Sequence, residues 1–221
     1  MAVLGFAGAA QASPFTITST LTGDPRPENP DNIIVNLTVS GDTTSNLTNW
    51  IVDLNSPLHP NAELHEFNFN LVGLFADYTF GNFDPINWSV VAGTNGPGSG
   101  SADFIFQADR NPPGGNVTNS VNLTFDVTRV AGNFSINDFL NAASSCSSDA
   151  ALGCGQVGAH IGSLTPAYRQ NDSGFAMGNY ASAGNPPPPP PPPAAIPEPG
   201  SLFLAGSGVV WLVRRARRRQ G

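Results

Sequence analysis

Apolar and polar residues alternate along several segments of this chain, and this two-residue period is the strongest constraint on its fold. In residues 33–40 and 120–128 every second residue or so is Ile, Val, Leu or Phe. Successive side chains of a β-strand point to opposite faces, so both segments are predicted as strands with one buried face. The residues predicted to point inward are Ile33, Val35, Leu37, Val39, Val121, Leu123, Phe125 and Val127, with a third stripe at Phe67, Phe69, Leu71 and Phe75.

Shorter segments rich in β-branched and aromatic residues are predicted as further strands. Clusters of Asn, Asp, Gly and Pro separate these segments and are typical of turns. Many strands with turns between them and no long helical pattern predict a mainly β chain, folded as an antiparallel β-sandwich with one short helix. The further strands are predicted at residues 15–21, 47–54, 78–83, 88–92, 103–108, 157–164 and 175–180.

The short helix is predicted at residues 135–143. Ser135 and Asp138 match the S-x-x-D pattern that often starts a helix, because the two residues can satisfy each other's backbone N–H groups. The apolar face of this helix would consist of Ile136, Phe139 and Leu140. A second, hydrophobic helix is predicted at the C-terminus.

The C-terminal segment Ile196–Gly221 combines three features in a distinct order. Pro197-Glu198-Pro199 precedes an uncharged, largely apolar run from Ser201 to Val213, and arginines follow that run. Thirteen helical residues rise about 20 Å, which is short for a hydrocarbon core of about 30 Å. A basic cluster at one end of such a helix favours a cytoplasmic end and acts as a membrane stop. The cluster consists of Arg214, Arg215, Arg217, Arg218 and Arg219.

This order of motif, helix and arginines resembles a PEP-CTERM sorting signal, which occurs on exported proteins of Gram-negative bacteria. The resemblance covers about a tenth of the chain. It implies an exosortase as partner, the inner membrane as a transient location of the precursor, and the cell surface or extracellular matrix as destination. It also implies a link to exopolysaccharide, but it carries no activity. An ordinary single-span membrane anchor is the alternative interpretation.

The N-terminus agrees with export. Residues 1–10 are small and apolar, and Ala10-Gln11-Ala12 is an A-x-A cleavage pattern. The positively charged start of a signal peptide is missing, as expected if the recorded start is late or the chain is a fragment. The predicted organisation is a signal peptide at 1–12, a β-sandwich body at 13–184, a proline-rich linker at 185–195 and a sorting signal with a transmembrane helix at 196–221.

The body is strongly acidic and contains no lysine. Four arginines against fifteen acidic residues between Ser13 and Ala195 leave a formal charge of −11. Binding to nucleic acid needs a basic patch that contacts phosphates, so nucleic acid is excluded as a partner. Divalent cations could screen or bridge this charge.

The two cysteines, Cys146 and Cys154, are eight residues apart. In an exported chain such a pair predicts a local disulfide. A zinc site that adds Asp149 or His160 is the alternative, but it has too few ligands at a suitable spacing.

The three histidines are His59, His65 and His160. Alternation predicts that Glu63, His65 and Phe67 share one face of a strand. A metal site from His59, Glu63 and His65 is conceivable, but a position at a solvent-exposed strand end is the simpler interpretation. No metal and no cofactor are expected, and Ca²⁺ binding has no linear motif to support it.

Catalytic patterns are also missing from the sequence. It contains no G-x-S-x-G elbow and no H-E-x-x-H motif. The carboxylate pairs Asp103 with Asp109 and Glu63 with Glu66 have no context that would raise a pKa. A non-enzymatic protein is therefore expected, with no catalytic residue.

The function expected for the body is that of a surface or matrix-associated protein. A carbohydrate-binding module is the alternative from another class, and a secreted hydrolase has the least support. Sugar-binding modules stack ligands on exposed aromatic rings. The aromatic candidates are Trp50, Trp88, Tyr78, Tyr168 and Tyr180, of which both tryptophans are predicted to lie in the core.

Overall fold

The computed structural model describes residues 12–23, 33–93, 103–111, 116–147, 153–164 and 172–184. The chain divides into two compact units, 1–185 and 186–221, and all of the second lies outside the described residues. The sorting motif Pro197-Glu198-Pro199, the arginine cluster, the predicted C-terminal helix and Ala10 therefore lie outside them. Ala12 is described, and it is exposed.

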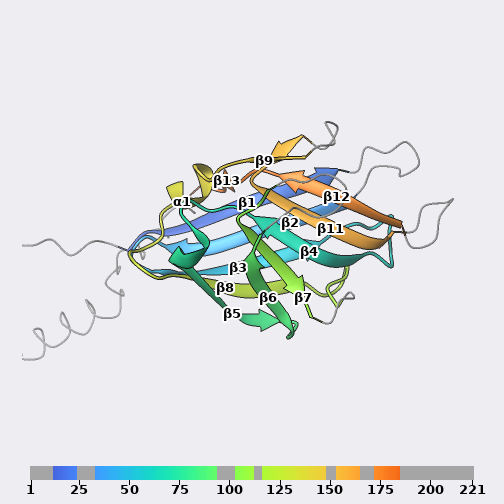
Figure 1. The fold of residues 1–221 in the computed structure, drawn as a ribbon, viewed down its shortest axis with the longest axis horizontal. Coiled ribbons are helices and arrows are strands. Elements are labelled where there is room, and N and C mark those ends of the chain that lie inside the picture. Colours follow the sequence, from blue (N-terminus) through green and yellow to red (C-terminus); the bar gives the residue numbers. More distant parts are fainter. Residues whose placement is uncertain are drawn as a thin grey trace, which may run out of the picture. The chain divides into compact units, whose positions relative to one another are not determined.

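The described body is built almost entirely of strands (Figure 1). Most of the strands predicted from alternation are present, and three of them, at 47–54, 88–92 and 157–164, have the predicted bounds. The elements are β1 (Pro14–Gly23), β2 (Ile33–Asp42), β3 (Leu47–Leu54), β4 (Glu63–Phe69), η1 (Phe75–Asp77), β5 (Tyr78–Asp84), β6 (Trp88–Ala92), β7 (Phe106–Arg110), β8 (Leu123–Arg129), α1 (Asn137–Leu140), β9 (Ser145–Cys146), β10 (Cys154–Gly155), β11 (Val157–Leu164), β12 (Asp172–Gly178) and β13 (Ala181–Ser182).

Eleven of the strands form an antiparallel sheet with the order β5-β8-β3-β2-β1-β12-β11-β4-β7-β6, in which β13 pairs with β1 beside β12. The remaining two strands, β9 and β10, form a separate two-stranded sheet. The predicted fold class, a mainly β antiparallel sandwich with one short helix, is confirmed. The two layers are halves of one continuous sheet, where separate sheets were expected. The sheet begins at β5 and ends at β6, and only residues 85–87 connect these two strands. Its two edges therefore lie close together, and the sandwich approaches a barrel.

The core lies between the two halves of the sheet, around Trp50. The Trp50 ring on β3 lies 4.8 Å from the ring of Phe69 on β4 and 5.4 Å from that of Phe125 on β8, measured between centroids. Phe69 in turn stacks on Phe106 of β7 at 5.0 Å. Each such aromatic pair contributes about 0.5–1.5 kcal/mol beyond the area that it buries. These contacts hold the β3–β8 half against the β4–β7 half.

Two residues of the predicted apolar stripes do not lie in the core. Val121 is 43% exposed, because β8 begins only at Leu123 and Val121 instead forms an isolated bridge with Thr118. Phe75 is only partly buried, since β4 ends at Phe69 and Phe75 begins the separate helix η1.

The helix α1 is shorter than predicted. Asp138 accepts hydrogen bonds from the backbone N–H and the hydroxyl of Ser135, as the S-x-x-D pattern suggested. The helix nevertheless ends at Leu140, whose side chain is 37% exposed and does not belong to the buried face. The side-chain amide of Gln156 donates to the carbonyl oxygens of Phe139, Leu140 and Ala142. It thereby satisfies carbonyl groups that the short helix leaves open.

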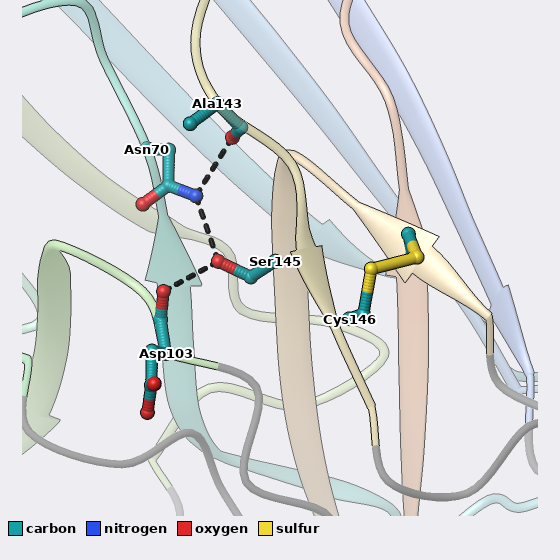
Figure 2. Close-up of a disulfide and its surroundings, with 6 residues drawn as sticks. Asn70, Asp103, Ala143, Ser145 and Cys146 are labelled. Carbon is teal, nitrogen blue, oxygen red and sulfur yellow. Dashed lines mark hydrogen bonds between the residues drawn. A yellow bond between two sulfur atoms is a disulfide. The ribbon is translucent and has the colours of Figure 1, made fainter.

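The disulfide between Cys146 and Cys154 is present and joins β9 to β10 (Figure 2). The hairpin is also held from outside by side chains. The Asn70 amide donates to the carbonyl oxygen of Ala143 and to Oγ of Ser145, and Ser145 donates to the carbonyl oxygen of Asp103. The disulfide therefore closes the hairpin itself, while these hydrogen bonds connect the hairpin to Asn70 and Asp103. Among the described residues, no helix has both the length and the apolar character that crossing a membrane would require.

Candidate functional site

A group of polar side chains lies on the outer face of the β12-β11-β4-β7-β6 half of the sheet. On this face Glu66 of β4 pairs with His160 of β11 on one side and with Asp109 of β7 on the other. In the next row, Asn68 of β4 pairs in the same way with Gly158 and Gln107. The antiparallel ladders thus place residues from three parts of the sequence side by side, away from the core.

A β-bulge in β4 determines which side chains reach this face. His160 lies opposite Glu66, but the next residue of β11, Ile161, lies opposite Leu64, so His65 is an extra residue. Such a bulge reverses the alternation after it. Phe67 is therefore fully buried, while Glu63 and His65 are about one third exposed. The prediction that Glu63, His65 and Phe67 share one face is wrong for this reason.

Two carboxyl groups meet at one amide on this face. Nε2 of Gln107 donates to Oε1 of Glu66 and, at 2.8 Å, to Oδ2 of Asp109. Glu66, Gln107 and Asp109 are called the carboxyl cluster below. The sequence-based pairs, Asp103 with Asp109 and Glu63 with Glu66, are replaced by this pair of Glu66 and Asp109 from two neighbouring strands.

The surroundings of the carboxyl cluster favour protonation. Burial, together with the negative charge of Asp109, raises the pKa of Glu66 to about 7, although the bond from Gln107 acts in the opposite direction. Burial also raises the pKa of Asp109, again against the bond from Gln107. The expectation that these carboxyl groups lack any context that raises a pKa is therefore wrong. That context is created by strand pairing and does not appear in the local sequence.

Two histidines lie beside the carboxyl cluster. Nδ1 of His160 is 3.9 Å from Oε2 of Glu66, which is too long for a hydrogen bond. The ring of His160 stacks on Phe175 of β12 at 4.6 Å and lies 5.4 Å from the ring of His65. Burial, with a smaller contribution from His65, lowers the pKa of His160 to about 4. His160 is therefore neutral near pH 7 and does not neutralise Glu66.

Two glycines on β11 make room for aromatic rings on this face. A Cβ atom at Gly162 would lie 2.1 Å from the His65 ring, and one at Gly158 would lie 3.0 Å from the Phe104 ring. Both rings therefore lie against bare backbone. Phe104 is 3% exposed but does not belong to the main core. Its ring lies against Gly158 on the outer face of the sheet.

Asn68 is buried next to the carboxyl cluster without a hydrogen bond. Its side chain is 1% exposed, and neither Oδ1 nor Nδ2 has a partner. Buried amide groups are normally paired, and leaving one unpaired costs about 1–3 kcal/mol. The directly opposite residue on β7 is Gln107, whose own amide is engaged with the two carboxyl groups.

The other residues singled out from the sequence do not join this site. His59 is 2% exposed in the turn after β3, so the expected solvent-exposed position is wrong. No group of three or more His, Cys, Asp or Glu residues in the described part of the chain could hold a metal ion.

Four of the five aromatic candidates are at most 7% exposed, namely Trp50, Trp88, Tyr78 and Tyr180. The fifth, Tyr168, lies outside the described residues. The prediction that both tryptophans lie in the core is confirmed.

Comparison of the chain with protein-family models, with curated proteins and with solved structures gives no match. A function can therefore be inferred only from the residues of this chain and their arrangement.

The carboxyl cluster was missed at the level of sequence. The only trace that it leaves there is two short alternating segments, Glu66-Phe-Asn68 and Gln107-Ala-Asp109, each with polar residues on one face. Nothing in the sequence states that these two segments pair, or in which register, because they are about 40 residues apart.

Proposed function

We propose that this chain is an exported, non-enzymatic protein of the cell surface or extracellular matrix, sorted by an exosortase. The observation that carries the proposal is the order at the C-terminus: Pro197-Glu198-Pro199, an uncharged run and then the arginine cluster. The disulfide between Cys146 and Cys154 supports it, because such bonds persist mainly in oxidising compartments outside the cytoplasm.

The body suits a role as a displayed domain. Most of its buried hydrophobic residues form one core between the two halves of the sheet, and its acidic surface favours solubility after export. The burial of four of the five aromatic candidates argues against a sugar-binding platform built on those residues. The scaffold role therefore remains the first choice over the carbohydrate-binding module.

Intact-mass measurement of the surface or secreted form tests the sorting proposal. In a host with an exosortase, the mature protein should end near Pro197-Glu198-Pro199 and lack the arginines. The same chain with Pro197→Ala and Glu198→Ala should keep its tail in that host. A mature wild-type form that still ends at Gly221 would leave a plain membrane anchor and overturn the proposal.

A secreted hydrolase is the alternative that gains from the carboxyl cluster. General acid–base hydrolysis of glycosides uses a pair of carboxyl groups, of which the acid has a raised pKa. Two features rank it second. Gln107 already donates to both carboxyl groups, and both pKa values are raised, whereas an acid and a base need theirs pushed apart. Turnover of a glycan by the full chain, lost in Glu66→Gln and in Asp109→Asn, would promote the hydrolase.

A further inference from the structure

In the described part of the chain, Glu66 and Asp109 share a single hydrogen-bond donor, which is fewer than half-buried carboxylates normally have. Among the described residues, the amide of Gln107 is the one donor within hydrogen-bond distance of either group. Arg129, one of the two arginines in that part of the chain, pairs with Asp138, and the body contains no lysine. Buried carboxylates are usually paired with a cation, so this site is incomplete.

We propose that the carboxyl cluster is a recognition site for an organic cation, an ammonium or guanidinium group that binds between Glu66 and Asp109. The position suits an N–H donor, because Nε2 of Gln107 already bonds to one oxygen of each carboxyl group. A charged N–H group makes stronger bonds to carboxylates than a neutral amide does. The cation would therefore replace a weaker donor at the same point.

Asn68 provides the second, independent observation. When a cation displaces the Gln107 amide from the carboxyl groups, that amide can turn to Asn68, which is its direct neighbour across the β4–β7 ladder. Asn68 has an unpaired acceptor and an unpaired donor and is 1% exposed. The buried, unpaired amide of Asn68 is thus explained as the partner that Gln107 takes when the cation is bound. The free-energy cost of leaving Asn68 unpaired is then present only in the protein without the cation.

The surrounding charges agree with this ligand. The groups that face Glu66 are Asp109 from β7, His160 from β11, and Glu63 and His65 from β4, while Phe175 of β12 and Ser89 of β6 carry no charge. His160 is neutral near pH 7. The net field at the cluster is therefore negative, and the acidic body attracts cations from a distance. No metal-binding group is found among the described residues, which favours an organic cation over a metal ion.

The binding should depend on pH, because the cation favours the ionised carboxyl groups. The pKa of Glu66 is about 7 in the free protein, so its ionised fraction rises about tenfold between pH 6 and pH 8. The affinity for a cation should rise by about the same factor over this range. A His65→Gln variant should keep this dependence, since Glu66 is the group responsible.

The experiment measures binding of n-butylguanidinium to the purified full chain by calorimetry or by NMR, with n-butylurea as an uncharged probe of nearly the same shape. The expected result is binding of the cation, no binding of the urea, and at least a tenfold loss in Glu66→Gln and in Asp109→Asn. The matched control is Asp126→Asn on the other half of the sheet, which should stay within twofold of wild type.

Three results would overturn the proposal. They are equal binding of the cation and the urea, unchanged affinity in Glu66→Gln, and displacement of the cation by Ca²⁺ with a well-defined stoichiometry, which would indicate a metal site.

Asn68→Val separates a ligand role from a structural one: it should raise the melting temperature and weaken cation binding. Unchanged binding would refute the turn of Gln107 toward Asn68. No exosortase is involved, so these outcomes are independent of the sorting proposal.

Discussion

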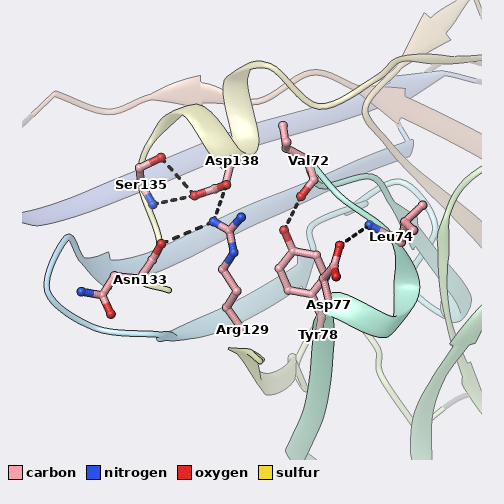
Figure 3. Close-up of polar contacts among 8 residues, drawn as sticks. All are labelled: Val72, Leu74, Asp77, Tyr78, Arg129, Asn133, Ser135 and Asp138. Carbon is pink, nitrogen blue, oxygen red and sulfur yellow. Dashed lines mark hydrogen bonds and ion pairs between the residues drawn. The ribbon is translucent and has the colours of Figure 1, made fainter. Parts of the chain in front are cut away.

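Arg129 donates a hydrogen bond from Nη1 to Oδ1 of Asp138 at 2.7 Å, and this bond ties the end of β8 to the helix α1 (Figure 3). The other oxygen of Asp138 accepts from the backbone N–H and the hydroxyl of Ser135. Asp138 is 8% exposed at its side chain, while Arg129 is 26% exposed. Asp138 thus joins the start of the helix to a strand of the sheet.

Asp138→Ala should lower the free energy of unfolding by about 3 kcal/mol, because it removes the charged partner of the Arg129 guanidinium and the acceptor of a backbone N–H. Among the described residues, the guanidinium then keeps only its long bond of 3.4 Å to the carbonyl oxygen of Asn133. Asp126→Ala is the matched control. Asp126 also accepts two side-chain hydrogen bonds, from Asn49 and Asn82, but both bonds are exposed, so the loss should be below about 1 kcal/mol. Urea denaturation measures both values, and equal losses would contradict the role given to Asp138.

Replacement of Cys146 and Cys154 by serine should lower the stability by about 2–3 kcal/mol without abolishing the fold. The fold should survive because Asn70 still holds Ala143 and Ser145 at the start of the hairpin. Thermal unfolding followed by circular dichroism measures the change. Labelling of two free thiols in the native, unreduced wild-type protein would refute the disulfide.

Glu66→Gln should change how stability depends on pH. An acid whose pKa is raised in the folded state binds more protons when folded, so ionised Glu66 destabilises the fold as pH rises from about 4.5 to about 7. The difference in unfolding free energy between the variant and wild type should therefore grow in favour of the variant across this range and stay constant above it.

His160 changes the free energy of unfolding in the opposite direction over part of that pH range. Its pKa falls from 6.5 to about 4 on folding, so its contribution is lost as pH falls through that window. The two effects partly cancel in wild type between about pH 4.5 and 6.5. In Glu66→Gln the increase in stability with rising pH that His160 causes should no longer be offset. Denaturation at several pH values measures this increase. A pH-independent difference between the two proteins would rule out a raised pKa at Glu66.

Adhesion of the protein to a polyanionic matrix should require divalent cations. The body carries a formal charge of −11 between Ser13 and Ala195, which repels an anionic polymer unless Ca²⁺ or Mg²⁺ screens or bridges the two. Retention on immobilised alginate with and without a chelator tests this expectation, and neutral dextran serves as the control matrix. Retention on alginate that survives chelation would contradict it.

The alternation of side chains was sufficient to predict most of the strands, the β-sandwich class and the buried positions of Trp50 and Trp88. This information is local, since a residue's face in a strand follows from its neighbours. The disulfide was also predictable, because Cys146 and Cys154 are close enough in sequence to meet in a hairpin whatever the rest of the fold does.

The candidate site was decided by tertiary structure alone. Glu66 meets Asp109 because β4 pairs with β7 in one register, and an extra residue, His65, turns Phe67 into the core. A shift of one position would place each of these side chains on the opposite face. The raised pKa of Glu66 and the unpaired amide of Asn68 both depend on how segments far apart in sequence pack together. Local periodicity therefore determined the strands, while long-range register determined the chemistry that the sheet presents.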